Sequence, residues 1–199
     1  MLINKGGKGM LSREQKAQFS YEDYLTWDGN EKWELLYGIP YAMSPAPSRI
    51  HQEICGEMFF KIRTYLQGKS CNVYTAPFDV RLCKEDASEN EIINVIQPDI
   101  TVICNKDILD DRGAKGVPDL VVEVVSPSST FLDYVKKLNL YGEYGVKEYW
   151  IIDPKKRSLF VYQIDETGRY GAPNIYSDKD HVKVGIFDKL VIELEEIFQ

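Results

Sequence analysis

Residues 118–128 read PDLVVEVVSPS, and they are the segment that says most about the fold. Its centre is an apolar run interrupted by one acid, Glu123, with three apolar residues before it and two after it. A run this apolar predicts a β-strand that is buried on both faces, as in the middle of a sheet covered by helices. A charge in such a strand costs several kcal/mol unless a cation, a metal ion or a cleft lies beside it. If the strand lay at a sheet edge with one face in water, the acid would be harmless, and both interpretations remain open here.

The neighbouring segments predict alternating helices and strands. Helical spacing of apolar residues predicts helices over residues 49–67 and 129–144, ended by Gly68 and Gly145, and Ser48 can cap the first of them. The other expected elements are a short capped helix from Tyr21, a hairpin over 33–43 around Gly38, strands over 72–83, 92–104, 148–153 and 158–164, a polar turn over 107–116, and short strands in 169–199. The order predicts one α/β domain with a mixed sheet over residues 19–199, after a flexible N-terminal arm at residues 1–18.

A second acid and a helical stripe accompany Glu123. Asp99 lies in the expected strand over 92–104, within Gln97-Pro98-Asp99. In the helix over 129–144, Asp133, Lys137 and Tyr141 follow one another at spacings of four, which places them within roughly 80° of one another on one face. Such a stripe is commonly a solvated face, but here the lysine is in a position to reach back over the strand that carries Glu123.

Composition excludes several classes of protein. The chain has 199 residues, of which 44% are hydrophobic and 28% charged, values that exclude collagen-like, coiled-coil and wholly disordered proteins. The net charge of −7, from 24 Lys+Arg and 31 Asp+Glu, is the wrong sign for binding nucleic acid by bulk attraction alone. The four cysteines form no Cys-x-x-Cys pair, so the usual ligand pairs of structural zinc are missing. They could form two disulfides in a secreted protein, but free thiols are expected in a cytosolic one, and the N-terminus does not resemble a signal peptide. The sequence has no apolar run typical of a signal peptide or a membrane helix, which favours a cytoplasmic protein without membrane contact.

Together these motifs resemble the Uma-type restriction endonuclease family, formerly a domain of unknown function, within the PD-(D/E)XK restriction-endonuclease-like superfamily. The resemblance rests on Pro98-Asp99, on residues 118–128, and on Asp133-x3-Lys137-x3-Tyr141 followed by GVKEYWIIDP at residues 145–154. An opening with WELLYG at residues 33–38, MSP at 43–45 and then His51 also agrees with it. The resemblance implies an α/β (α+β) fold: a restriction-endonuclease-like core whose mixed sheet is flanked by two main helices, with an extra N-terminal hairpin and C-terminal strands.

The resemblance also implies a site and an activity. Asp99 and Glu123 take the places of the signature acids that hold a metal ion, and Glu34 is a further candidate ligand. Val125 stands where the signature has its lysine, so Lys137 is the candidate for a relocated catalytic lysine, in preference to Lys136, which points about 100° away. The peripheral candidates are His51, Asp79, Asp133 and Tyr141.

The implied function is a Mg²⁺-dependent endonuclease, with Mn²⁺ as a substitute ion, that hydrolyses DNA phosphodiester bonds as a homodimer. The missing lysine at Val125 and the net acidity favour an alternative, a catalytically inactive nuclease-like scaffold that binds nucleic acid or a protein. A third interpretation is a carboxylate-pair hydrolase acting on sugars, which would need two opposed carboxyl groups without a shared ion.

Overall fold

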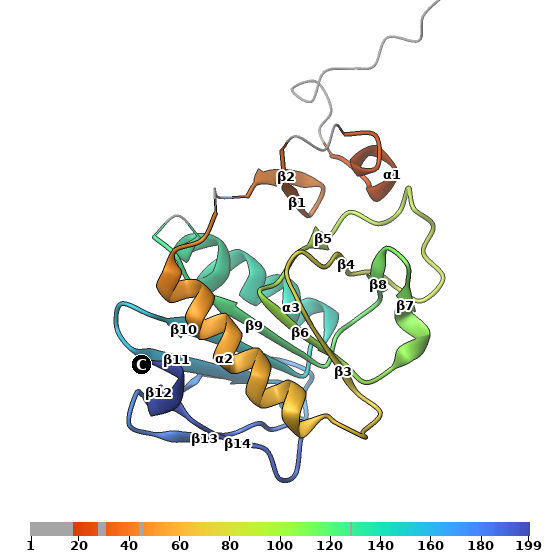
Figure 1. Ribbon diagram of the computed structural model, residues 1–199. Coiled ribbons are helices and arrows are strands. Elements are labelled where there is room, and N and C mark those ends of the chain that lie inside the picture. The colour runs from red at the N-terminus through yellow and green to blue at the C-terminus, as the bar shows by residue number, and fades with distance from the viewer. Residues whose placement is uncertain (1–17, 28–30, 44–45, 128) are drawn as a thin grey trace, which may run out of the picture.

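The computed structural model describes residues 18–27, 31–43, 46–127 and 129–199 (Figure 1). Its centre is a six-stranded mixed sheet in the order β12-β11-β10-β9-β6-β3. The strands are β3 (Asn72–Thr75), β6 (Ile100–Ile103), β9 (Leu120–Val124), β10 (Glu148–Asp153), β11 (Ser158–Gln163) and β12 (Asn174–Ser177). β9 and β10 are parallel, and the other neighbours are antiparallel. Every residue of β9 and β10 is buried, so the prediction of an inner strand around Glu123 is confirmed and the edge-strand alternative is wrong.

One helix lies on each face of this sheet, as the resemblance implied. The helix α2 (Arg49–Tyr65) buries Ile54, Met58 and Ile62 against one face, in an apolar cluster with every second residue of β9, beginning at Leu120. The helix α3 (Leu138–Tyr144) packs on the other face, where Leu140 meets Val121 and Val125. Because successive side chains of a strand point to opposite faces, Glu123 shares the α3 face with Val121 and Val125. The Glu123 side chain therefore lies on the face of the sheet that α3 covers.

A second six-stranded sheet, in the order β2-β1-β5-β4-β8-β7, contributes to the α3 side. Its strands are β1 (Trp33–Leu36), β2 (Ile39–Ala42), β4 (Val80–Arg81), β5 (Val95–Ile96), β7 (Leu109–Asp110) and β8 (Gly113–Lys115). The predicted hairpin is confirmed, and its turn at Tyr37 and Gly38 has positive φ at both residues, which suits a tight two-residue connection. The remaining elements are α1 (Tyr21–Tyr24) with the predicted capping box at Ser20, the 3₁₀-helix η1 (Lys106–Ile108), β13 (His181–Lys183), β14 (Val191–Glu193) and α4 (Leu194–Ile197).

Two predicted strands are in fact broken by prolines. The strand expected over 72–83 ends at Thr75, before the cis peptide bond between Ala76 and Pro77, and resumes as β4 in the other sheet. The strand expected over 92–104 is divided around Pro98 into β5 and β6, because proline has no N–H to donate to a ladder. Asp99 therefore lies immediately before β6 rather than inside a strand, which corrects the prediction. The polar turn expected over 107–116 contains η1 and the β7–β8 hairpin.

The second main helix begins irregularly. Residues Leu132–Lys137 form a π-helix, η2, which runs directly into α3, and the chain leaves α3 at Gly145 with φ of 80°. Short π segments inside helices are often found at functional sites. The helical spacing of the sequence did not predict this segment.

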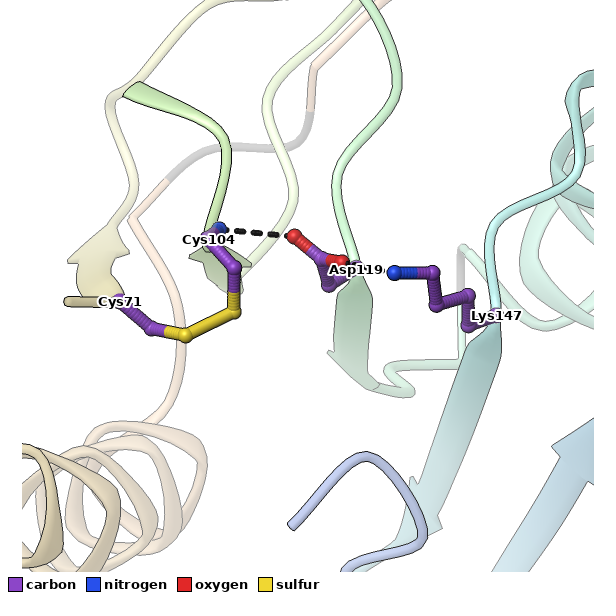
Figure 2. The surroundings of a disulfide bond; sticks show 4 residues. All are labelled: Cys71, Cys104, Asp119 and Lys147. Carbon is purple, nitrogen blue, oxygen red and sulfur yellow. Dashed lines mark hydrogen bonds and ion pairs between the residues drawn. A yellow bond between two sulfur atoms is a disulfide. The ribbon is translucent and has the colours of Figure 1, made fainter.

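The prediction of free thiols is wrong for two of the four cysteines. The antiparallel pairing of β3 with β6 places Asn72 opposite Ile103, so residues 71 and 104 face each other one step further along. Cys71 and Cys104 form a disulfide there (Figure 2), while Cys55 and Cys83 are free. Beside the disulfide, the Cys104 N–H donates to the Asp119 carboxylate at 2.7 Å, and Lys147 donates to the other oxygen of Asp119 at 2.6 Å. The disulfide thus lies in a bonded network that fastens β6 to the start of β9.

The arm predicted at residues 1–18 lies outside the described residues except for Gln18, and Ser44, Pro45 and Ser128 lie outside them too. Among the described residues, no helix combines the length and the apolar character required to cross a membrane.

Candidate active site

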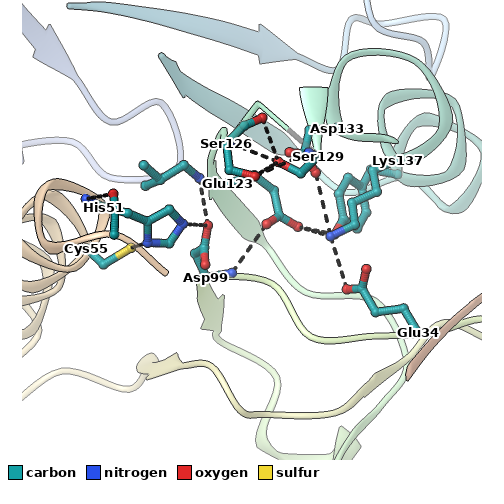
Figure 3. Close-up of polar contacts among 12 residues, drawn as sticks. Glu34, His51, Cys55, Asp99, Glu123, Ser126, Ser129, Asp133 and Lys137 are labelled. Atoms are coloured by element: carbon teal, nitrogen blue, oxygen red, sulfur yellow. Dashed lines mark hydrogen bonds and ion pairs between the residues drawn. The ribbon is translucent and has the colours of Figure 1, made fainter. Parts of the chain in front are cut away.

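Strand register brings Asp99 and Glu123 together. β6 and β9 are antiparallel with Ile100 opposite Val122, so the residue before Ile100 lies opposite Glu123. The Asp99 N–H donates to Glu123 Oε2 over a long 3.4 Å, and the Val124 N–H donates to Asp99 Oδ2 at 2.8 Å. Figure 3 shows the two carboxylates side by side between α2 and η2. Two acids separated by 24 positions in the chain thus meet at one point of the sheet.

Lys137 lies against three carboxylates. Its Nζ is 2.9 Å from Glu123 Oε1, 3.0 Å from Glu34 Oε1 and 3.7 Å from Asp133 Oδ1. The lysine side chain is only 5% exposed, and so is the Glu123 side chain. A buried ammonium is tolerated only when its charge is compensated in this way. The structure therefore brings the predicted lysine to the signature acid from the neighbouring helix (Figure 3).

Burial and neighbouring charges together raise the pKa values of both Glu123 and Lys137. Burial raises the pKa of Glu123 well above its ordinary value, Lys137 opposes that shift, and Asp133, Asp99 and Glu34 add to it. Burial alone would lower the pKa of Lys137, but the carboxylates of Glu123, Glu34 and Asp133 raise it well above its ordinary value. Lys137 is therefore a fixed cation.

Tyr141 completes the predicted stripe. Its hydroxyl donates to Glu123 Oε1 at 3.1 Å, the same oxygen that Lys137 contacts. Burial, together with the charge of Glu123, raises the pKa of Tyr141 well above its ordinary value, so its hydroxyl stays protonated as a donor. Asp133, Lys137 and Tyr141 are all buried, so the interpretation of the stripe as a solvated face is wrong. Two donors on Oε1 leave Oε2 as the Glu123 oxygen directed at Asp99.

Glu34 and Asp79 lie further along the same network. Glu34, on β1, accepts the Gln97 N–H at 2.8 Å as well as the contact from Lys137. The Gln97 side chain in turn donates to Asp79 Oδ1 at 2.8 Å, and burial raises the pKa of Asp79. In the structure Glu34 contacts the lysine, whereas Asp79 reaches the group only through Gln97.

His51 contacts the site from the first turn of α2. Its backbone N–H donates to the Ser48 cap at 3.2 Å, and its Nε2 lies 3.2 Å from Asp99 Oδ2. Burial would lower the pKa of His51, but the contact with Asp99 raises it above its ordinary value. The histidine is thus both a residue of the helix start and a partner of Asp99.

Sequence reasoning missed Cys55. It lies one turn after His51, and its Sγ is 3.5 Å from the imidazole Nδ1. Burial raises the pKa of the Cys55 thiol, and the charges of Asp99 and Glu123 raise it further. The spacing of four between a histidine and a cysteine in one predicted helix was the signal that could have found it.

Val125 and Lys136, which were not chosen as the catalytic residue, have other partners in the structure. Val125, at the usual lysine position of the signature, lies in the apolar cluster with Leu140 and is 9% exposed. Lys136 contacts the Tyr41 hydroxyl on β2 and lies 4.8 Å from the centre of that ring. The ammonium beside Glu123 therefore comes from Lys137 alone among these candidates.

The donor set suits a divalent cation. Four carboxylates meet at this place (Glu34, Asp99, Glu123 and Asp133), and within the described part of the chain the cationic groups in contact with them are Lys137 and, when protonated, His51. Carboxylate oxygens are the ligands that Mg²⁺ prefers, and an added cation would offset this excess of buried negative charge. Among these acids, Asp99 and Glu123 are joined directly, because the Asp99 N–H donates to Glu123 Oε2, the oxygen that Lys137 does not contact.

The fold matches a solved structure. A crystal structure from Anabaena variabilis, described as a putative nuclease of the DUF820 group, superimposes with a TM-score of 0.71 over 90% of this chain and 97% of its own, at 17% identity. This likeness shows a shared nuclease-like fold.

The sequence also matches known proteins. An uncharacterized protein of Synechocystis sp. is 26% identical over 167 residues, which is 80% of this chain and 83% of that protein. The profile of the family described as "Uma2: Putative restriction endonuclease" matches residues 21–195 and so covers both sheets and the whole acid–lysine group. This chain therefore belongs to the Uma2 family.

Proposed function

We propose that this chain is an endonuclease that hydrolyses phosphodiester bonds of DNA, and that Asp99 and Glu123 hold a Mg²⁺ ion, or Mn²⁺ in its place. The observation that carries the proposal is the arrangement around Glu123. Lys137 and Tyr141 contact Oε1, whereas Oε2 is directed at Asp99. Family membership and the nuclease-like fold support the same reaction class.

Phosphodiester hydrolysis requires an oriented water, compensation of growing negative charge and a stabilised leaving oxygen. When bound, a divalent cation lowers the pKa of a water and binds phosphoryl oxygens. Lys137 supplies a second positive charge beside the same acid, where it orients the attacking water or compensates charge in the transition state. Since its ammonium is buried and held by three carboxylates, it is preorganised for this role.

The surrounding residues keep the two acids in place. The Val124 N–H and His51 both contact Asp99 Oδ2, so that carboxylate has a defined orientation. Tyr141 fixes Glu123 through its hydroxyl, while Glu34 and Asp133 hold the Lys137 ammonium. The sugar-hydrolase interpretation is less well supported, because the Asp99 backbone contacts the Glu123 carboxylate and the two acids are not opposed across a gap.

The direct test is cleavage of supercoiled plasmid DNA and of single-stranded RNA with Mg²⁺ or Mn²⁺. The variant Asp99→Asn should lose at least about a hundredfold in rate, because the site then lacks one of its two ligands. The matched control is Asp107→Asn, an exposed acid just beyond the other end of β6.

The possible outcomes distinguish a wrong site assignment from an inactive scaffold. If Asp99→Asn cuts as fast as the wild type, the assignment of the site is wrong. If the wild type cuts neither substrate but binds a labelled duplex, the nuclease-like scaffold is favoured instead. We retain the homodimer as a prediction because restriction-type nucleases often dimerise to cut both strands. Light scattering of the purified chain checks it.

A further inference from the structure

A second set of potential ligands lies on the α2 side of Asp99. His51, Cys55 and Asp99 each offer one ligand atom, and these three atoms all lie within 4.8 Å of one another (Figure 3). From this set, the nuclease proposal uses Asp99 as a ligand and His51 only to orient the Asp99 carboxylate. The sulfur of Cys55 has no part in it.

The position of the three groups suits an ion that enters from solvent. The His51 side chain is 12% exposed and that of Asp99 is 20% exposed, and Cys55 is half-buried. His51 and Cys55 come from successive turns of α2, so the helix backbone fixes their spacing. The carboxylate, by contrast, is held by β6 and β9 through the Val124 N–H. Both sides of the set are therefore rigid.

The ligand chemistry differs from that of the carboxylate pair. Imidazole nitrogen and thiolate sulfur select zinc-like ions, whereas Mg²⁺ prefers oxygen alone. Bond lengths for tetrahedral zinc imply about 3.3 Å between a nitrogen and an oxygen ligand. The Nε2 of His51 and the Oδ2 of Asp99 are 3.2 Å apart, so these two ligands already have the required separation. The Cys55 Sγ lies 3.5 Å from the other ring nitrogen, Nδ1, and its side chain has to turn toward Nε2 to bind the same ion.

We propose that His51, Cys55 and Asp99 form a site for a zinc-class divalent cation, and that this ion inhibits cleavage because it takes Asp99 away from the Mg²⁺ site. Three protein ligands leave a fourth position for water, as in open zinc sites. Binding replaces the thiol proton of Cys55 with the metal ion, and the proton is released to solvent. The inhibitory part rests on the proposed nuclease function, whereas the metal site itself does not.

Co²⁺ is the probe for the site, because a cobalt–thiolate bond gives a charge-transfer absorption that oxygen ligands do not give. We expect this band when Co²⁺ is titrated into the full-length wild type, and its loss on addition of Zn²⁺. Cys55→Ser should abolish the band. The matched control Cys83→Ser should retain it, since Cys83 is the other free cysteine and lies in a different apolar cluster.

Two further variants test the metal site without a change to the cysteine. His51→Gln should weaken Co²⁺ binding by at least about tenfold, because it removes one of the three proposed ligands and leaves the cysteine in place. Glu123→Gln should keep the cobalt band while losing Mg²⁺-dependent cleavage, because Glu123 is no part of the set. A wild type without the band, or a band that survives Cys55→Ser, would overturn the metal site.

Inhibition is measured separately. Zn²⁺ should slow Mg²⁺-dependent cleavage by the wild type, and Cys55→Ser should need about tenfold more Zn²⁺ for the same effect. Equal sensitivity of the two proteins would refute the inhibition while the cobalt result stood. If the chain cut no nucleic acid at all, the nuclease proposal would fail and the cobalt titration would still decide the metal site.

Discussion

Replacement of Lys137 by methionine should destabilise the protein strongly and in a pH-dependent way. The lysine Nζ is about 3 Å from two carboxylates and 3.7 Å from a third, and its side chain is 5% exposed. At an effective dielectric constant of about 20, each of the two short contacts corresponds to roughly 5 kcal/mol of attraction. The cost of burying the charges offsets most of this attraction. The net contribution of these contacts to the free energy of unfolding is therefore much smaller than the sum of the attractions.

Removal of the lysine charge alone is more costly, because the carboxylates stay buried without their cationic partner. Removal of one partner of a buried ion pair typically costs about 3–5 kcal/mol, and we expect Lys137→Met to fall in that range near neutral pH. The carboxyl groups can reduce this cost by taking up protons. Burial already raises the pKa of Glu123 in the wild type, where Lys137 opposes the shift, so the variant should raise it further.

The direction of the pH dependence follows from that raised pKa. A carboxyl group whose pKa is higher in the folded than in the unfolded protein favours folding at low pH, and this contribution is lost as pH rises through the folded value. The deficit of Lys137→Met relative to the wild type should therefore grow from acid to neutral pH. The change is about 1.4 kcal/mol per pH unit for each carboxyl group that exchanges a proton.

Urea unfolding of both proteins across that pH range measures the deficit. The control is Lys136→Met, which removes a neighbouring half-buried lysine and its contact with Tyr41, and should cost less than about 1 kcal/mol. If Lys137→Met were as stable as the wild type at neutral pH, or if its deficit did not change with pH, the account of a cation held among charged carboxylates would be refuted.

Two further predictions concern hydrogen-bonded side chains. Tyr141→Phe removes the donor to Glu123 Oε1 but keeps the ring beside Tyr149, so it should cost about 1–2 kcal/mol in urea unfolding and should raise the Mg²⁺ concentration needed for cleavage. An unchanged Mg²⁺ requirement would show that Tyr141 is structural only. Although burial opposes it, hydrogen bonds from Arg81 and Arg112 lower the pKa of Asp110, so its contribution to stability is present above 3.8 and is lost as pH falls through the lowered value. Because its side chain is 48% exposed, Asp110→Asn should cost only about 1 kcal/mol at neutral pH, and nothing in strong acid, with Asp111→Asn as the control.

Much of the site was predictable because its residues lie in regular elements. An acid inside an apolar strand and a lysine at helical spacing from Asp133 and Tyr141 are patterns of local sequence, and both placed their side chains correctly. The resemblance supplied the pairing of the two, which no local pattern contains. The meeting of Asp99 with Glu123 depends on the register of β6 against β9, and register is a property of the sheet.

The misses have particular physical causes. Pro77 and Pro98 interrupt apolar runs that alternate like strands, and each break moves the chain between the two sheets. The Cys71–Cys104 disulfide depends on the register between β3 and β6, so cysteine spacing alone did not reveal it. Cys55 was missed because a half-buried cysteine on a helix is ordinary, and only the packing of α2 against Asp99 brings it close to two other potential ligands.

The net charge of −7 argues against nucleic-acid binding when only composition is considered. The structure weakens that objection. Several acids are buried and therefore add little to the charge of the molecular surface: Glu34, Asp119, Glu123, Asp133, Glu148 and Asp153. The helix α2 carries His51 toward the site. On this helix, Arg49 forms an ion pair with Glu53, and Lys61 forms one with Glu196, so α2 does not present a strongly positive surface. Attraction between this surface and a phosphate backbone is therefore modest, and affinity must come mainly from the site itself. Under the proposed function, a cation bound among the four carboxylates would serve two purposes: it would take part in the reaction, and it would bring an anionic substrate close to Asp99 and Glu123.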